Sequence, residues 1–273
     1  MAKRVPPRVA DHVPAIQRLR IRYAKRGRLR FTSHRDFQRA LERALRRAEV
    51  PMAFSAGFSP HPRISYANAA PTGVASEAEY FEIGVVRHCD PLMVKQQLDA
   101  ALPPGLDIVD VVEAATPDFA ARLEASRWSI RLDQVDASEL AAAVTAIMAA
   151  DEAPVERMTK GGQRTIDVRA ALLAAYVTAG TGDGSADSTH SAGAGMEQTG
   201  CVILNVVVRQ VTPTVRPHDV LAALRSVAGF VPPVPALVTR EQQGPLAAEG
   251  VFIQDPLAPD RESAGAGGTT VVP

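Results

Sequence analysis

The sequence is poor in cysteine and has no long hydrophobic segment. Its 273 residues include only two cysteines, Cys89 and Cys201, so a disulfide framework is excluded. No apolar run reaches the about 18 residues that a membrane-spanning helix needs. The basic N-terminus is not followed by the apolar core of a secretory signal. We therefore expect a cytoplasmic protein with no membrane partner.

Motifs that mark most cofactor-dependent enzymes are also missing. The chain has no CxxxCxxC set for the iron–sulfur cluster of a radical-SAM enzyme, and no CxxC pair for a zinc ribbon. It also lacks the GxxxxGK[ST] phosphate-binding loop, the GxGxxG dinucleotide fingerprint and the GxSxG nucleophile elbow. These absences disfavour most cofactor-dependent chemistry, and we expect neither a bound metal nor a cofactor.

The sequence does contain a strong asymmetry of charge. Over the whole chain 30 Lys and Arg balance 30 Asp and Glu. Residues 1–63, however, hold 16 basic and 4 acidic residues, a net of +12, and residues 64–273 hold 14 and 26, a net of −12. A cationic first quarter attracts polyanions, and phosphate contacts dominate nucleic-acid affinity. The asymmetry favours RNA or DNA as a partner, with a solvated face or an acidic patch of the same chain as the alternative.

The hydrophobic pattern of the N-terminal half predicts alternating strands and helices. Residues 17–24 alternate polar and apolar side chains, as in a half-buried strand. Apolar residues then recur at helical spacing over 37–48, behind the N-cap residue Ser33. A shaped loop between strands follows within 52–67, then a strand at 77–86, a helix at 91–102 and a strand at 106–112, so the order is strand, helix, strand–strand, helix, strand. This is the element order of a ferredoxin-like α+β domain.

The C-terminal half repeats this order of elements without repeating the sequence. It predicts strands at 128–132, 201–208 and 235–239, helices at 136–150 and 217–228, a hairpin around 161–162 and a short helical stretch at 169–176. We therefore predict an α+β protein of two tandem ferredoxin-like domains, each an antiparallel sheet with helices on one face. The predicted parts are a flexible basic arm 1–16, a first domain 17–114, a second domain 126–242 with a disordered insertion 179–200, and a disordered tail 243–273.

Candidate binding residues concentrate between residues 28 and 73. The predicted helix carries arginines along one face, where like charges four residues apart cost about 0.2–0.5 kcal/mol per pair unless an anion offsets them. The loop after the helix adds an aromatic side chain that can stack on a base. We predict a nucleic-acid interface made of Arg35, Arg39, Arg43, Arg46, Arg47, Arg63 and Phe58.

Two histidines in the same region suggest a catalytic alternative. His34 and His61 lie in predicted turns and would form a general acid/base pair for phosphodiester chemistry if the fold brings them together. Asp36 is the third catalytic candidate, although three residues after an N-cap it also suits capping. The structural alternatives are a hydrogen bond at the helix start for His34 and a loop-fixing contact for His61. The surrounding motif is shaped by Ser33, Gly57, Pro60 and Pro62.

The segments RLRFTSHRDFQRALERALRRAEVP, MAFSAGFSPHPRISYA and APTGVASEAEYFEI resemble the radical-SAM-linked protein family, a domain of unknown function. The resemblance covers about residues 18–240 and is specific over 28–83. It implies a stand-alone form of a domain that is otherwise fused behind a radical-SAM enzyme, and a link to RNA or translation, but no activity. The family's motif positions here are Ser33, His34, Asp36, Arg43, Arg46, Arg47, Gly57, Phe58, Pro60, His61, Pro62 and Ser65.

Three functional hypotheses remain open from the sequence. The first is an accessory protein that binds tRNA or rRNA and assists a separate modifying or processing enzyme. The second is a metal-independent RNA-acting enzyme that uses His34 and His61. The third is a protein-docking module for a radical-SAM partner, in which the arginine face meets an acidic protein surface.

Overall fold

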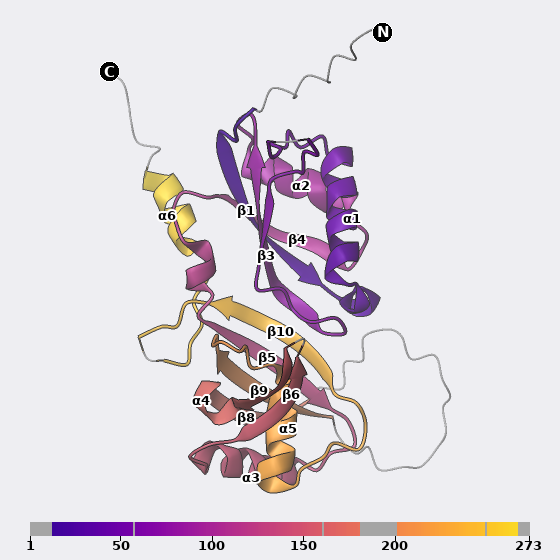
Figure 1. Ribbon diagram of the computed structural model, residues 1–273, viewed down its shortest axis with the longest axis vertical. Helices are drawn as coiled ribbons and strands as arrows, with labels where there is room; N and C mark the ends of the chain where they lie inside the picture. Colours follow the sequence, from indigo (N-terminus) through magenta and orange to yellow (C-terminus); the bar gives the residue numbers. More distant parts are fainter. Residues whose placement is uncertain (1–12, 57, 160, 181–200, 249, 267–273) are drawn as a thin grey trace, which may run out of the picture. The chain divides into compact units, whose positions relative to one another are not determined.

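The structure is an α+β protein that divides into two compact units (Figure 1). The computed structural model describes residues 13–56, 58–159, 161–180, 201–248 and 250–266. Unit 1 comprises Met1–Ala121 and Pro256–Pro273, and unit 2 comprises Arg122–Asp255. Within the described residues, no helix has the length and apolar character needed to cross a membrane.

Unit 1 follows the order strand, helix, strand, strand, helix, strand. Its strands form an antiparallel sheet in the order β4-β1-β3, with β2 paired to β3. The elements are β1 (Gln17–Lys25), α1 (His34–Arg47), β2 (Ile64–Ala67), β3 (Ala75–Val85), α2 (Pro91–Ala101) and β4 (Leu106–Glu113), with short 3-10 helices η1 (Gly27–Phe31) and η2 (Phe119–Arg122).

The residues of strand β1 alternate between an apolar face and a basic face of the sheet of unit 1. Leu19, Ile21 and Tyr23 are buried in one core with the apolar sides of α1 and α2. Because successive strand residues point to opposite faces, the intervening arginines lie on the other side of the sheet. This second side, which we call the arginine face of the sheet, carries Arg18, Arg20 and Arg22.

Helix α1 is defined by signals at both of its ends. Ser33 is the N-cap, and its Oγ accepts a hydrogen bond from the backbone N–H of Asp36 at 3.2 Å. After Arg47 the chain leaves the helix through Glu49, whose φ is +51°, and Pro51 prevents continuation. The buried side of the helix consists of Phe37, Leu41, Ala44 and Leu45. The arginines are thereby turned to solvent.

The segment between α1 and β2 folds back on itself as a hairpin, here called the 54–62 hairpin. Phe54 and Pro62 form an isolated antiparallel bridge. The backbone N–H of Ser55 donates to the carbonyl of His61 at 2.8 Å, and the N–H of His61 donates to Ser55 Oγ at 3.0 Å. The two arms are therefore joined by both backbone and side-chain hydrogen bonds.

The base of this hairpin is fixed to strand β3. Ala53 N–H donates to the carbonyl of Gly84 at 2.8 Å, and Gly84 N–H donates to the carbonyl of Arg63 at 3.0 Å. A Cβ atom on Gly84 would lie only 2.9 Å from the Cβ of Ala15. Glycine at this position permits the close approach of the chain that precedes β1.

The chain returns to unit 1 after unit 2. Helix α6 (Ala258–Ala266) lies on the arginine face of the sheet, on the side away from α1 (Figure 1). Arg20 Nη1 donates to both carboxylate oxygens of Asp260 at 2.6 Å, and Asp260 is fully buried. Asp260 Oδ1 also accepts from the backbone N–H groups of Ala115 and Thr116 at 3.1 and 2.9 Å.

The prediction of a disordered tail over 243–273 is therefore wrong for its described part. Strand β10 (Leu237–Gly244) continues past residue 242, and α6 is docked by a buried ion pair and the fully buried side chain of Leu257. The sequence of this segment has no clear strand or helix pattern, which is why disorder was predicted. The order comes instead from one aspartate that meets an arginine far away in the sequence.

Unit 2 has the same order of elements with an added hairpin. Its antiparallel sheet has the order β10-β5-β9-β8, and β6 pairs with β7 in a separate two-stranded sheet. Besides β10, the elements are β5 (Ala125–Leu132), α3 (Ala137–Ala149), β6 (Pro154–Thr159), β7 (Gly162–Asp167), α4 (Val168–Ala171), β8 (Leu172–Ala179), β9 (Val202–Arg209) and α5 (Pro217–Ala228).

One predicted element of unit 2 is largely wrong. Only four residues form helix α4, and the rest of the predicted helical stretch 169–176 belongs to strand β8. Pairing with the apolar strand β9 outweighs the helix propensity of the alanines. Gly180 N–H closes the end of this ladder on the carbonyl of Cys201 at 2.8 Å. Residues 181–200 of the predicted insertion, and 1–12 of the predicted arm, lie outside the described residues.

We predict that Asp260→Ala destabilises the protein by about 3 kcal/mol, at the lower end of the cost of breaking a buried ion pair, because the buried Arg20 loses Asp260 but keeps Glu82, whose carboxylate lies 3.2 Å from its Nε. Burial opposes ionisation of Asp260, but hydrogen bonds from Thr116 and Arg20 and the charge of Arg20 outweigh it and lower the pKa of the carboxyl group. The stabilisation of the folded protein by ionised Asp260 is therefore present above the unfolded pKa of about 3.9. It is lost as the pH falls through the lower pKa of the folded state.

Urea unfolding at pH 7 and at pH 3 measures the loss of stability in Asp260→Ala and the dependence of that loss on pH. The difference in unfolding free energy between wild type and Asp260→Ala should be smaller at pH 3. Asp151→Ala removes an exposed aspartate and serves as the control. Equal stability of the wild type and Asp260→Ala at pH 7 would contradict the assignment.

Candidate nucleic-acid interface

The outward side of α1 is a row of exposed arginines, here called the arginine row. Arg35, Arg39, Arg43 and Arg46 follow one another at intervals of four, four and three residues. Arg39 Nη1 lies 4.0 Å from a carboxylate oxygen of Asp36. Among the residues that the structure describes, Arg35 and Arg43 form no ion pair. Most of the positive charge of the row is thus available to a partner.

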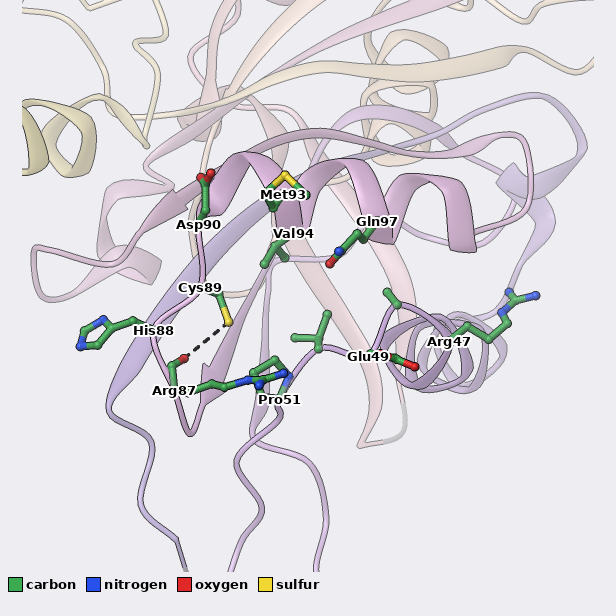
Figure 2. Close-up of a pocket in the computed structure, with 12 residues that line it drawn as sticks. Arg47, Glu49, Pro51, Arg87, His88, Cys89, Asp90, Met93, Val94 and Gln97 are labelled. Atoms are coloured by element: carbon green, nitrogen blue, oxygen red, sulfur yellow. Dashed lines mark hydrogen bonds between the residues drawn. The ribbon is translucent and has the colours of Figure 1, made fainter.

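The end of α1 borders a hollow of about 550 Å³ between this helix and α2 (Figure 2). Arg47, the last predicted binding arginine of the helix, is exposed and donates to the carbonyl of Ala101 at the end of α2. Its guanidinium therefore also links the two helices.

A cysteine also lines this hollow. Cys89 Sγ donates to the backbone carbonyl of Arg87 at 3.5 Å (Figure 2). Burial raises the pKa of the Cys89 thiol despite the opposing charge of Arg87, so the group is not activated as a nucleophile. In the described parts of the chain, no group of three or more His, Cys, Asp or Glu side chains is arranged to hold a metal ion.

The two histidines proposed for catalysis lie on different elements. The ring of His34, at the start of α1, meets Tyr66 edge-on with 4.8 Å between ring centroids, and its Nε2 lies 3.1 Å from Gln38 Nε2. His61 is held by backbone hydrogen bonds within the 54–62 hairpin. No hydrogen bond or ring contact between the two histidines occurs within the described residues. These contacts match the structural alternatives given above, a hydrogen bond at the helix start for His34 and a loop-fixing contact for His61. The acid/base role of the two histidines stays a prediction.

Asp36, the third catalytic candidate, takes part in the cap of α1. Ser33 Oγ donates to Asp36 Oδ2 at 2.7 Å, in addition to accepting from the Asp36 backbone. The carboxylate also stands in the first turn of the helix, where negative charge is stabilised by the helix dipole. These contacts give Asp36 a structural role in capping α1 that requires no catalytic function.

The remaining predicted residues lie in or beside the 54–62 hairpin. Phe58 is 96% exposed, and Pro60 is exposed as well. Pro62 is half-buried at the bridge that joins the two arms, and Arg63 is exposed at the base. Gly57 lies outside the described residues.

The sequence reasoning missed a groove on the arginine face of the sheet. Two hollows of about 350 and 430 Å³ share three lining residues, Arg18, Ser65 and Glu82. The first hollow is also lined by Ser55 and Arg63, so the base of the 54–62 hairpin forms part of its wall. The alternation that predicted the core side of β1 also places arginines on the opposite side of the strand. This pattern was the sequence signal from which the groove could have been predicted.

Tyr66 joins α1 to the edge of the sheet. Its ring lies 6.1 Å from Phe37 and 6.3 Å from Phe81, measured between centroids. Burial and the nearby carboxylate of Glu42 raise the pKa of Tyr66 to about 12. The tyrosine is therefore part of an aromatic cluster rather than an open stacking platform, and it fixes the first turns of α1 relative to β2.

The chain matches a protein-family model over most of its length. A family described as "uncharacterized protein conserved in bacteria (DUF2344)" matches residues 18–217. None of the curated proteins matches the chain. The matched range includes the arginine row, the 54–62 hairpin and the groove residues Arg18, Ser65 and Glu82.

We predict that Glu42→Gln lowers the pKa of Tyr66 from about 12 but leaves it above the ordinary value of about 10. The substitution removes the nearby negative charge and keeps the burial, which is the larger cause. Carbon-13 NMR of labelled tyrosine, with Tyr66→Phe to assign the signal, follows the phenol up to pH 11. Glu49→Gln, at an exposed position just after the helix, should leave the titration unchanged. A Tyr66 that titrates near pH 10 in the wild type would refute this geometry.

Proposed function

The chain belongs to this family of uncharacterized bacterial proteins, and we propose that it is an RNA-binding accessory protein that holds RNA for a separate modifying or processing enzyme. The arginine row of α1 is the observation that carries the proposal. It concentrates four exposed guanidinium groups on one side of one helix, and the only carboxylate paired with the row is that of Asp36, at 4.0 Å in the described residues.

The spacing of the arginine row suits a phosphate backbone. Arginines four residues apart rise about 6 Å along a helix, so the row from Arg35 to Arg46 spans about 16 Å. Each guanidinium can hold a phosphate with two parallel hydrogen bonds. Bound phosphates would also relieve the repulsion between neighbouring arginines, which the single carboxylate paired with the row in the described residues, that of Asp36, offsets only at Arg39.

The proposed division of labour leaves the chemistry to a partner. The resemblance to the radical-SAM-linked family supports a radical-SAM or RNA-processing enzyme in that role, and supports RNA over DNA as the bound polymer. The neutral thiol of Cys89 and the structural contacts of His34 and Asp36 also favour binding over catalysis.

The order of the strands supports a finer description of the fold. The orders β4-β1-β3-β2 and β10-β5-β9-β8 place equivalent elements of the two units in the same sequence. We take both units as ferredoxin-like on this basis, with β6 and β7 as an insertion in unit 2. RNA-recognition domains also use four-stranded sheets of this size, which is support by analogy.

The test replaces three members of the arginine row together. We predict that the variant Arg35→Gln/Arg39→Gln/Arg43→Gln binds tRNA or rRNA fragments more weakly. The slope of log affinity against log salt concentration should become shallower by about two to three, because each lost phosphate contact contributes about 0.7–0.9. Fluorescence anisotropy over a range of salt concentrations measures both quantities.

The matched control replaces three exposed arginines of unit 2, Arg164→Gln/Arg209→Gln/Arg225→Gln, and removes the same charge from the chain. It should keep the wild-type salt slope. If both triple variants change the RNA affinity and the salt slope equally, binding depends only on the net charge of the chain, which contradicts the proposed interface. Nuclease-resistant capture of a radical-SAM enzyme, without RNA binding, would favour the docking module instead.

A further inference from the structure

The tip of the 54–62 hairpin presents an aromatic ring to solvent. Among the large hydrophobic side chains of the described residues, Phe58 is the most exposed, at 96%, and Phe54 on the same hairpin is 48% exposed. Phe37 and Phe81 of unit 1 are buried in the core, whereas Phe31 in η1 is also exposed, at 60%. The core does not need Phe58, which points to contact with a ligand.

The arms of the hairpin that carries this ring are joined to each other and to the sheet. They are joined by the Phe54–Pro62 bridge and by the hydrogen bonds between Ser55 and His61, and the base of the hairpin is bonded to β3 through Gly84. A phenylalanine has only two side-chain torsions, so little conformational entropy is lost when it binds.

Cationic side chains stand beside the base of the hairpin. Arg63 and Arg18 line the hollow of about 350 Å³ together with Ser65 and Glu82. The side chain of Arg18 is 65% exposed, with Nη1 3.7 Å from the Glu82 carboxylate. An aromatic platform next to a positively charged groove is the combination that binds single-stranded nucleic acids, since bases stack and phosphates meet arginines.

We infer that this hairpin binds an unpaired nucleotide of single-stranded or looped RNA, with the base stacked on Phe58 and an adjoining phosphate at Arg63 and Arg18. The inference rests on the proposed RNA binding and adds the form of RNA that is selected. Bases inside a duplex are stacked on one another and cannot offer a face to Phe58. The arginine row contacts phosphates of either form, so the hairpin is the element that discriminates between them.

The first test compares Phe58→Ala with wild type on a single-stranded oligonucleotide and on a duplex of the same length. Loss of one stacked base should weaken single-strand binding about 5- to 100-fold. Duplex binding and the salt slope should not change, because no charge is removed. Phe252→Ala removes another exposed phenylalanine, in unit 2, and should change neither affinity.

The second test reports stacking directly. In the Phe58→Trp variant, single-stranded RNA should quench the new indole fluorescence and duplex RNA should not. The native Trp128 is only 4% exposed and supplies a constant background. Phe58→Leu keeps an apolar side chain without a ring and should weaken single-strand binding as Phe58→Ala does.

The outcomes separate this inference from the proposed function. If wild type binds neither form of RNA, the proposed function fails and the inference fails with it. If binding depends on the arginine row but Phe58→Ala leaves single-strand affinity unchanged, or weakens both forms equally, only the inference is overturned. An unquenched indole in the presence of bound single-stranded RNA would also overturn it.

Discussion

The buried ion pair between Arg20 and Asp260 determines how unit 1 is completed. It joins the first strand to the last helix across 240 residues of sequence, and the fully buried carboxylate also accepts hydrogen bonds from the chain after β4. An arginine in the middle of a sheet would be costly to bury alone. Helix α6 adds Asp260 to the carboxylate of Glu82 in β3, which already lies 3.2 Å from Arg20 Nε, and it covers that part of the arginine face, while the side chain of Arg18 remains 65% exposed beside the hairpin.

The alternation along β1 produces two working surfaces from one strand. Its apolar side anchors α1, which then exposes the arginine row on the far side of the helix. Its polar side carries Arg18, which lines the groove together with the base of the 54–62 hairpin. The helix and the hairpin that we propose as the two RNA-binding elements therefore share the same core, so destabilising that core would disturb both.

Much of unit 1 was predictable because local signals define it. Ser33 and Pro51 bound α1, and helical spacing alone assigns the arginines to one side. In unit 2, α5 likewise runs from Pro217 to the residue before Gly229, whose φ is +68°. Helix α6 and strand β8 escaped prediction because each depends on a distant partner, an arginine in β1 and the strand β9. The groove and the contact of His34 with Tyr66 also require the folded sheet.

The charge asymmetry of the sequence acquires a sharper meaning in the structure. Arg26 pairs with Glu77 and Asp107, and Arg20 pairs with Asp260, so part of the excess in residues 1–63 is neutralised by acids from later in the chain. Those pairs are structural. Unpaired charge remains on α1, where Arg35 and Arg43 meet no acid in the described residues, and on Arg28 and Arg30 of η1. The net charge of residues 1–63 therefore overstates the charge that is free of ion pairs, and the arginine row is the part of it on which our proposal depends.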